Sequence, residues 1–183
     1  MTPEIPVSGL TLILGGARSG KSSFAEKIAR EAGKSILFIA TATAGDGEMA
    51  ERIRNHQASR PAEWQTLELP RDLGSNLAAP IAEVVIVDCI TLLVSNILMS
   101  LPENAPAEAV MHKIRVEIDE LIAAQVSLGG QWLIVSNEVG MGLVPPYPSG
   151  RVYRDALGWA NQALARAASR VIFMVAGIPM VIK

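Results

Sequence analysis

The sequence lacks most features that mark secreted, membrane or nucleic-acid-binding proteins. Its one cysteine, Cys89, cannot form an internal disulfide, so the cysteine content does not suggest an oxidising compartment. No apolar run approaches the roughly 18 residues of a membrane span, and residues 1–9 lack the charged-then-apolar order of a signal peptide. The formal net charge is −2 without any basic block, which argues against a nucleic-acid partner. We therefore expect a cytoplasmic, soluble protein without a membrane span.

Hydrophobic residues, in contrast, are abundant. They make up 50% of the 183 residues, which is enough for a sizeable core and is compatible with buried subunit interfaces. The length suits one domain and is too short for two full ones. We expect residues 1–9 to form a loose lead-in and residues 10–183 to form a single domain.

The clearest chemical signal is the stretch Gly15-Gly16-Ala17-Arg18-Ser19-Gly20-Lys21-Ser22, which matches the G-x-x-x-x-G-K-[ST] pattern of a phosphate-binding P-loop. An apolar, strand-like run at residues 10–14 precedes it, and helical spacing follows at residues 23–30. This context argues against the alternative, a glycine-rich turn that merely precedes Lys-Ser. Glycines let successive N–H groups turn inward towards phosphate. We predict nucleotide binding, with Lys21 on the terminal phosphates and the Ser22 hydroxyl on Mg²⁺.

The rest of the chain alternates between strand-like and helix-like patterns. Strands joined by helices form right-handed parallel units, so the alternation predicts a P-loop NTPase fold of the α/β class, with a mostly parallel central sheet flanked by helices. We expect strands at residues 35–41, 64–69, 84–88, 131–136 and 170–177, a short hairpin arm at 180–183, and helices at 48–59, 71–83, 92–98, 107–127 and 149–168.

Asp88 ends an apolar run, as the Walker B acid beside Mg²⁺ does, although it could also be the N-cap of the next helix. Residues 41–47 and 137–146 follow predicted strands. Loops at the carboxyl ends of parallel strands surround the ligand crevice, but either segment could also be a plain connection. The short, mildly acidic chain favours a small-molecule kinase over a motor or a nucleic-acid ATPase.

Two histidines have different surroundings. His56 lies in the charged segment 48–59, and composition alone favours a solvated helix with ion pairs such as Glu48 with Arg52. His112 falls near the polar side of the predicted helix at 107–127 and is expected to be a surface residue.

The motifs together resemble the bifunctional adenosylcobinamide kinase/adenosylcobinamide-phosphate guanylyltransferase family of cobalamin biosynthesis. The resemblance spans nearly the whole chain after Gly9. It rests on the P-loop, Ile39-Ala40-Thr41-Ala42, Glu48-Met49 with Arg52-Ile53 and His56, Arg60-Pro61, Trp64, Asp88-Cys89-Ile90-Thr91, Asn96, Asn137-Glu138-Val139-Gly140-Met141-Gly142, Val144-Pro145, Arg154-Asp155 and Asn161-Gln162.

The resemblance implies two reactions and reverses the preference for a solvated helix at His56. In the first, Lys21, the P-loop amides and Mg²⁺ at Ser22 and Asp88 activate the γ-phosphate of ATP or GTP for attack by the aminopropanol hydroxyl of adenosylcobinamide. In the second, His56 carries GMP from GTP, and the new phosphate takes it to give adenosylcobinamide-GDP. A largely neutral imidazole suits such a nucleophile.

By the same resemblance, family members are trimeric and guanine-nucleotide contacts extend beyond the P-loop. The further contact positions are Thr41, Ala42, Thr43, Gln57, Ala58, Ser59, Arg60, Glu68 and Asp88. Two other hypotheses remain: a P-loop kinase without transferase activity, in which His56 has no role, and a nucleotide-dependent switch or assembly protein.

Overall fold

A computed structural model describes residues 8–43, 61–79 and 82–183. Its strands form one seven-stranded sheet in the order β3-β2-β4-β5-β1-β6-β7, in which β7 is antiparallel to β6 and every other pairing is parallel. The predicted α/β P-loop fold is therefore confirmed. The strands are β1 (Gly9–Gly15), β2 (Ile36–Ala40), β3 (Gln65–Glu68), β4 (Val84–Asp88), β5 (Gln131–Val135), β6 (Arg170–Val175) and β7 (Ile178–Val181).

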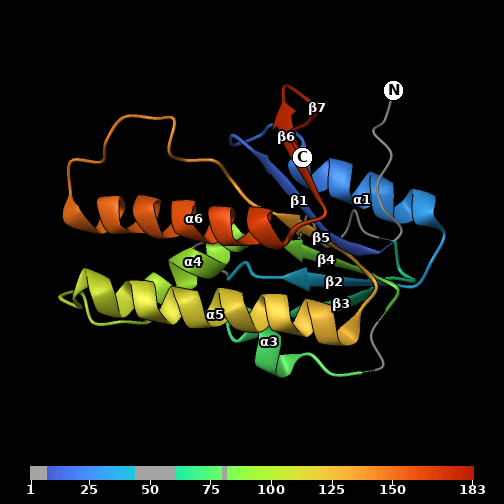
Figure 1. Cartoon of the computed structure of the whole chain (residues 1–183), viewed down its shortest axis with the longest axis horizontal. Helices are drawn as coiled ribbons and strands as arrows, with labels where there is room; N and C mark the ends of the chain where they lie inside the picture. The colour runs from blue at the N-terminus through green and yellow to red at the C-terminus, as the bar shows by residue number, and fades with distance from the viewer. Residues whose placement is uncertain (1–7, 44–60, 80–81) are drawn as a thin grey trace.

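Helices cover both faces of the sheet (Figure 1). One face carries α1, and the other carries α3, α4, α5 and α6, with α5 and α6 packed side by side. The helix bounds are α1 (Lys21–Ala32), α3 (Leu73–Asn76), α4 (Ile90–Met99), α5 (Ala107–Leu128) and α6 (Pro148–Ala167). The predicted helices and strands in the described residues are found within a few residues of their expected bounds, with one exception described below.

The central strands are continuously apolar because both of their faces are buried. In β2, Leu37 and Ile39 belong to the core under α3 to α6, whereas Ile36 and Phe38 belong to the core under α1. The alternation follows from the period of two along a strand. This layered core holds the carboxyl ends of the parallel strands along one edge, where P-loop proteins bind their ligands.

The helix predicted at residues 71–83 is wrong. Of the residues described in this segment, only those of α3 are helical, and Leu77 after it is extended, with φ −100° and ψ 132°. Leu73 is the one buried residue of this turn, and a Cβ on Gly74 would lie 2.6 Å from the Glu120 backbone. The segment is therefore pressed against α5 over a single turn. Serine, asparagine and glycine have low helix propensity, so nothing local extends the turn further.

Glu117 of α5 accepts the free N–H groups at the start of that turn. Its carboxylate accepts the N–H groups of Asp72 at 2.9 Å and of Leu73 at 2.8 Å, in the manner of a helix cap. Burial raises the pKa of this carboxyl, with the charges of Asp72 and Glu120 adding to the rise and the two N–H bonds opposing it.

The raised pKa of Glu117 predicts a pH-dependent stability. The folded chain binds this proton more tightly than the unfolded chain, so the contribution is fully favourable below the ordinary value of 4.5 and is lost as the pH rises through the raised pKa. The difference in unfolding free energy between wild type and the non-titrating Glu117→Gln variant should therefore fall from acid to neutral pH. Urea unfolding at several pH values measures it, and a difference that grows with pH would contradict the prediction.

The chain ends in a hairpin, as expected for residues 180–183, although its second strand begins earlier, at Ile178. Ala176 and Gly177 form the turn with φ values of 49° and 80°. The Gly177 N–H donates to the Ser19 carbonyl at 3.0 Å, so this turn touches the P-loop. In the part of the chain that the structure describes, no helix combines the length and the apolar character needed to cross a membrane.

Candidate active site

The P-loop connects β1 to α1 with geometry suited to an anion. Gly20 is the N-cap of α1 in the left-handed region and offers no side-chain cap. The first N–H groups of the helix, at Lys21 and Ser22, therefore remain available to a phosphate, where the helix dipole also favours negative charge. Gly15 is required by close approach, because a Cβ there would lie 2.5 Å from the Met174 carbonyl oxygen.

Lys21 lies beneath this loop and is only 7% exposed. Its Nζ donates to the Gly16 carbonyl at 2.6 Å and lies 3.5 Å from the Ser19 Oγ, so the loop itself holds the ammonium group. Burial lowers the pKa of Lys21, and the nearby Cys89 and Asp88 act in the opposite direction. Lys21 and Asp88 therefore lie close enough to interact electrostatically, and their sharing of one nucleotide site stays a prediction.

The ends of five neighbouring strands line the same edge. In sheet order these are Glu68 at the end of β3, Thr41 after β2, Asp88 at the end of β4, Glu138 after β5, and Gly15 at the end of β1. β4, which ends in Asp88, and β1, which leads into the P-loop, are thus separated by β5, and Glu138 after β5 contacts Gly15 at the end of β1. The sequence alone did not indicate this insertion.

Asp88 ends β4 directly before Cys89, which is half-buried. Asp88 is half-buried, and the Cys89 N–H that follows it donates to the Thr41 Oγ1 at 2.8 Å. Burial raises the pKa of the Cys89 thiol to about 11, with Asp88 adding to the rise. Very little thiolate therefore exists at neutral pH, so Cys89 is a poor nucleophile. Cys89, not Asp88, is the N-cap of α4, so the alternative role considered for Asp88 does not apply.

Asn96 of α4 ties the end of β2 to the segment after β3. Its Nδ2 donates to the carbonyls of Thr41 at 2.8 Å and of Pro70 at 3.0 Å, and its Oδ1 lies 3.4 Å from the Thr43 hydroxyl. Thr41 also donates its hydroxyl to the Cys89 carbonyl at 2.7 Å. These contacts fix the main chain at the carboxyl ends of β2 and β4 relative to each other.

Replacing Asn96 with alanine should destabilise the fold by about 1–3 kcal/mol, because two main-chain carbonyls lose their donor. Urea unfolding of the variant against wild type measures this. Asn104→Ala is the matched control, since Asn104 is exposed, and it should change stability by less than about 0.5 kcal/mol. Equal effects of both substitutions would contradict the prediction.

The structure describes some of the other predicted contact residues and not the rest. Ala42 is half-buried, and Thr43 and Glu68 are exposed along the same edge as Asp88. The predicted helix at 48–59 and a group of predicted site residues lie outside the described residues. That group is His56, Gln57, Ala58, Ser59 and Arg60. His112 is exposed on α5, as expected.

A buried polar network supports the loop that follows β5, and sequence reasoning missed it. The Ser136 hydroxyl donates to the Asn161 Oδ1 at 2.6 Å, and the Asn161 Nδ2 donates to the Asn137 carbonyl at 3.0 Å. The Thr91 hydroxyl accepts the Asn137 N–H at 2.8 Å, and its carbonyl accepts the Tyr153 hydroxyl at 3.2 Å. The only sequence signal was a polar residue, Asn161, on the apolar face of a predicted helix.

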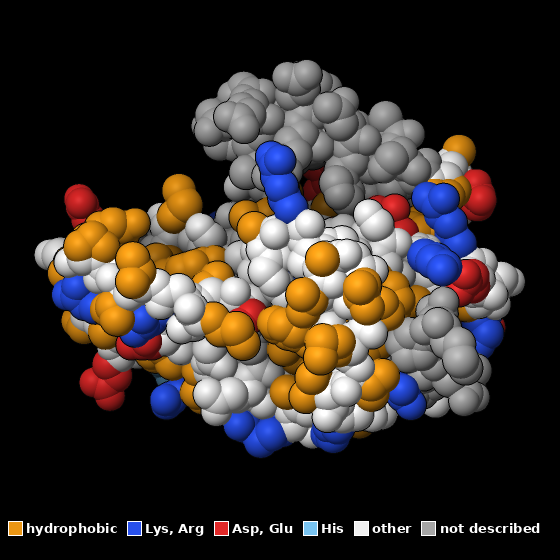
Figure 2. Space-filling view, turned by 90° about the horizontal axis from the view of Figure 1, so that it is seen from above, with side chains coloured by type: hydrophobic (Ala, Val, Ile, Leu, Met, Phe, Trp, Pro, Cys, Tyr) orange, Lys and Arg blue, Asp and Glu red, His pale blue; other side chains and the backbone are white. Residues whose placement is uncertain are grey.

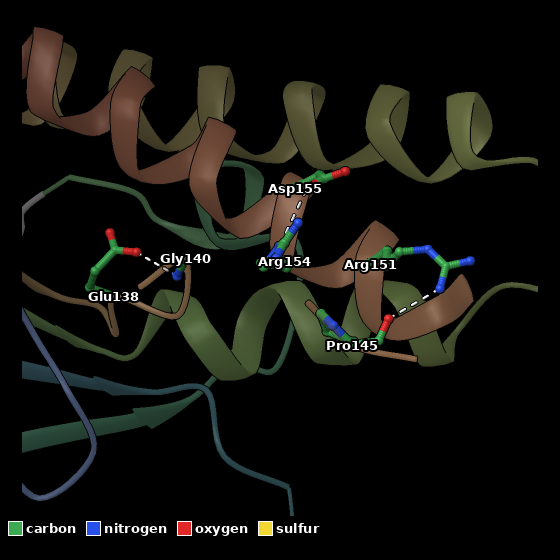
Figure 3. A network of polar contacts seen from close by, with 6 residues as sticks. All are labelled: Glu138, Gly140, Pro145, Arg151, Arg154 and Asp155. Atoms are coloured by element: carbon green, nitrogen blue, oxygen red, sulfur yellow. Dashed lines mark hydrogen bonds and ion pairs between the residues drawn. The ribbon is translucent and has the colours of Figure 1, made fainter. Parts of the chain in front are cut away.

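The later part of this loop, up to the start of α6, is hydrogen-bonded to Arg151 of that helix, and it carries exposed apolar residues. Arg151 donates from Nη1 to the carbonyl of Pro145 at 3.1 Å (Figure 3) and to that of Pro146 at 2.9 Å. The exposed large hydrophobic side chains of the loop are Met141, Leu143, Val144 and Tyr147.

The chain has a P-loop before a helix, an acid at the end of β4, which is a parallel strand separated from β1 by β5, and a sheet covered on both faces. These features define a P-loop NTPase fold. The flagellar accessory protein FlaH of Methanocaldococcus jannaschii shares this fold, with a TM-score of 0.52 and 14% identity over 98% of this chain and 80% of that one.

Sequence comparison identifies the family within that class. The model of the cobinamide kinase / cobinamide phosphate guanyltransferase family matches residues 11–182. The chain is 45% identical to the bifunctional adenosylcobalamin biosynthesis protein CobP of Pseudomonas aeruginosa, over 94% of this chain and 96% of that protein. It is 41% identical to the bifunctional adenosylcobalamin biosynthesis protein CobU of Salmonella typhimurium, over 95% of this chain and 99% of that protein. The chain belongs to this kinase and guanylyltransferase family, which confirms the resemblance inferred from its motifs.

Proposed function

We propose that the chain phosphorylates the aminopropanol hydroxyl of adenosylcobinamide and then transfers GMP from GTP to the product through a covalent intermediate on His56. The observation that supports this best is the placement of Lys21 and Asp88 on one edge of the sheet, in a chain of this family. Lys21 and the amides of the P-loop would neutralise the charge that develops on the γ-phosphate of ATP or GTP.

We propose that the same cradle holds GTP for the second reaction, with Thr41 to Thr43, Gln57 to Arg60, Glu68 and Asp88 contributing contacts. The imidazole of His56 attacks the α-phosphorus, the bond to the bridging oxygen breaks, and pyrophosphate leaves. The phosphate of the corrinoid then attacks the same phosphorus and releases His56. Division into two displacements makes a difficult transfer easier.

The donor set fits Mg²⁺. The described residues contain no group of three or more acidic, histidine or cysteine side chains that could hold a metal alone. Mg²⁺ commonly takes one or two protein oxygens together with substrate phosphates and water. We propose Ser22 and Asp88 as those protein ligands. The ion would supply charge neutralisation on the phosphates when bound.

We also propose a homo-oligomer, most simply a trimer, in the cytoplasm, where nucleoside triphosphates are available. Hydrophobic side chains gather on the face shown in Figure 2, the side of the molecule on which the β6–β7 hairpin lies in Figure 1. The exposed ones of the hairpin and the end of the chain are Val175, Ile178, Met180, Val181 and Ile182. A second copy could cover them. Sedimentation analysis tests this, and a monomer at micromolar concentration would contradict it.

The wild-type chain provides the test of the proposed reactions. After incubation with GTP labelled at the α-phosphate and denaturation, we expect label on the protein that is labile in acid and stable in alkali, as a phosphoramidate is. Adenosylcobinamide and ATP should give adenosylcobinamide phosphate. Kinase activity without covalent label would favour a kinase that lacks the transferase step, and nucleotide-dependent self-association without either activity would favour a switch protein.

A further inference from the structure

Glu138 lies between the two groups of residues that are proposed to bind the nucleotide, Asp88 on one side and the P-loop on the other. It follows β5, which lies between β4 with Asp88 and β1 with the P-loop. Its N–H donates to the carbonyl of Gly15 at 3.1 Å, so its backbone is one hydrogen bond from the first glycine of the phosphate-binding loop. The main chain of Glu138 therefore lies beside the loop that is proposed to hold the phosphates of the nucleotide.

The main chain around Glu138 is held from three sides. Gly15 of the P-loop bonds its N–H, while Thr91 of α4 and Asn161 of α6 bond the preceding residue, Asn137. Asn161 is only 6% exposed, and its partner Ser136 is fully buried. Because a buried and satisfied polar network is rigid, the position of Glu138 is set before any substrate binds.

The carboxylate of Glu138 is available to a substrate. One oxygen, Oε1, accepts the Gly140 N–H at 2.6 Å, and Figure 3 shows the other oxygen turned away from that bond. Glu138 is half-buried, and it forms no ion pair with the residues that the structure describes. A carboxylate oxygen is a proton acceptor of the kind that general-base catalysis uses.

The other carboxylates of this edge are less suited to accept a proton from the substrate. Asp88 is the proposed ligand of Mg²⁺ and lies close enough to Lys21 to affect its pKa. Glu68 ends β3, at the edge of the sheet and separated from the P-loop strand by β2, β4 and β5. Among the carboxylates that the structure describes at the ends of these strands, only Glu138 is both adjacent to the P-loop and not assigned to metal binding.

We propose that Glu138 is the general base of the kinase reaction, an inference that rests on the proposed function. As the aminopropanol oxygen bonds to the γ-phosphorus, the O–H bond breaks and its proton passes to a carboxylate oxygen of Glu138. The bond from the γ-phosphorus to the β,γ-bridging oxygen breaks at the same time. The nucleoside diphosphate leaves with that electron pair, and Glu138 later returns its proton to water.

Glu138→Gln is the sharpest test, because glutamine keeps an oxygen for the Gly140 N–H and removes only the basicity. We expect the kcat of adenosylcobinamide phosphorylation to fall by about 10²–10⁴-fold. Binding of GTP and covalent labelling from α-labelled GTP should stay within about twofold of wild type, since neither uses this proton transfer. Glu103→Gln, at an exposed loop position, is the matched control and should leave both activities unchanged.

A second variant separates a base from a structural residue. Glu138→Ala loses both carboxylate oxygens, and added formate should restore a measurable part of its kinase activity, because a small carboxylate can accept the proton in the space left by the side chain. Formate should not affect Glu138→Gln, in which that space is filled.

Three outcomes overturn the inference. Full kinase activity in Glu138→Gln shows that no base is needed at this position. Parallel loss of kinase activity and of covalent labelling in Glu138→Gln shows that the residue supports the site structurally. Wild-type chain that lacks kinase activity overturns the proposed function and the inference with it, whereas an active wild type with an equally active Glu138→Gln variant overturns the inference alone.

Discussion

The His56→Ala variant is expected to retain cobinamide kinase activity and to lose covalent guanylylation completely. Alanine removes the imidazole nitrogen that attacks the α-phosphorus in the proposed mechanism. The guanylyl transfer rate should fall by more than about 10³-fold, as when the nucleophile of other covalent enzymes is removed. Denatured protein after incubation with α-labelled GTP measures the intermediate, and formation of adenosylcobinamide-GDP measures the complete reaction.

His112 provides a matched control, because the chain has only two histidines and His112 is exposed on α5. His112→Ala should carry as much label as wild type. Persistence of label in His56→Ala would show that another group forms the covalent bond. Cys89 is the obvious candidate to exclude, and its thiol, with a pKa raised to about 11, is already unfavourable for that role.

The Lys21→Met variant is expected to lose both reactions. Methionine preserves most of the buried apolar stem and removes the ammonium group that the Gly16 carbonyl holds at 2.6 Å. Removal of one preorganised charge from a site of this kind costs about 10²–10³-fold in rate. The kinase turnover and the initial rate of covalent labelling should both fall by that factor, because the proposed mechanism uses one cradle for both triphosphates.

Lys34→Met is the control for loss of a positive charge, since Lys34 is exposed beyond the end of α1. It should leave both rates unchanged. If Lys21→Met abolishes phosphorylation but labels His56 at the wild-type rate, GTP is guanylylating the protein from a different pocket, and the proposal of one shared cradle is wrong.

Local patterns were sufficient for most of the fold. The P-loop motif between a strand and a helix, the apolar run that ends in Asp88 and the long amphipathic helices each have a signal within a few residues of chain. The segment 71–83 had a misleading signal, because its single turn is set by Glu117, a residue of another helix. Non-local contacts of this kind leave no periodicity in the segment that they determine.

The candidate site likewise combines features with a local sequence signal and features set by non-local contacts. The P-loop has a signal in the sequence, since its residues are consecutive in one short segment. The neighbours of that loop were not predictable, because the insertion of β5 between β1 and β4 depends on the order of strands in space. The polar network of Asn161 and the hydrogen bond from Glu138 to Gly15 follow from that order.

The strand order also has a consequence for synthesis on the ribosome. β1 contains the start of the P-loop, but its partners are β5 and β6, and Gly9 pairs with Gln131. At 5–20 residues per second, the partner of this first strand emerges on the order of ten seconds after it. Until then the nascent chain has the complete phosphate-binding motif without a sheet to hold it. Nucleotide affinity should therefore appear late in translation, and the apolar first strand is one that a chaperone would meet in an unpaired form.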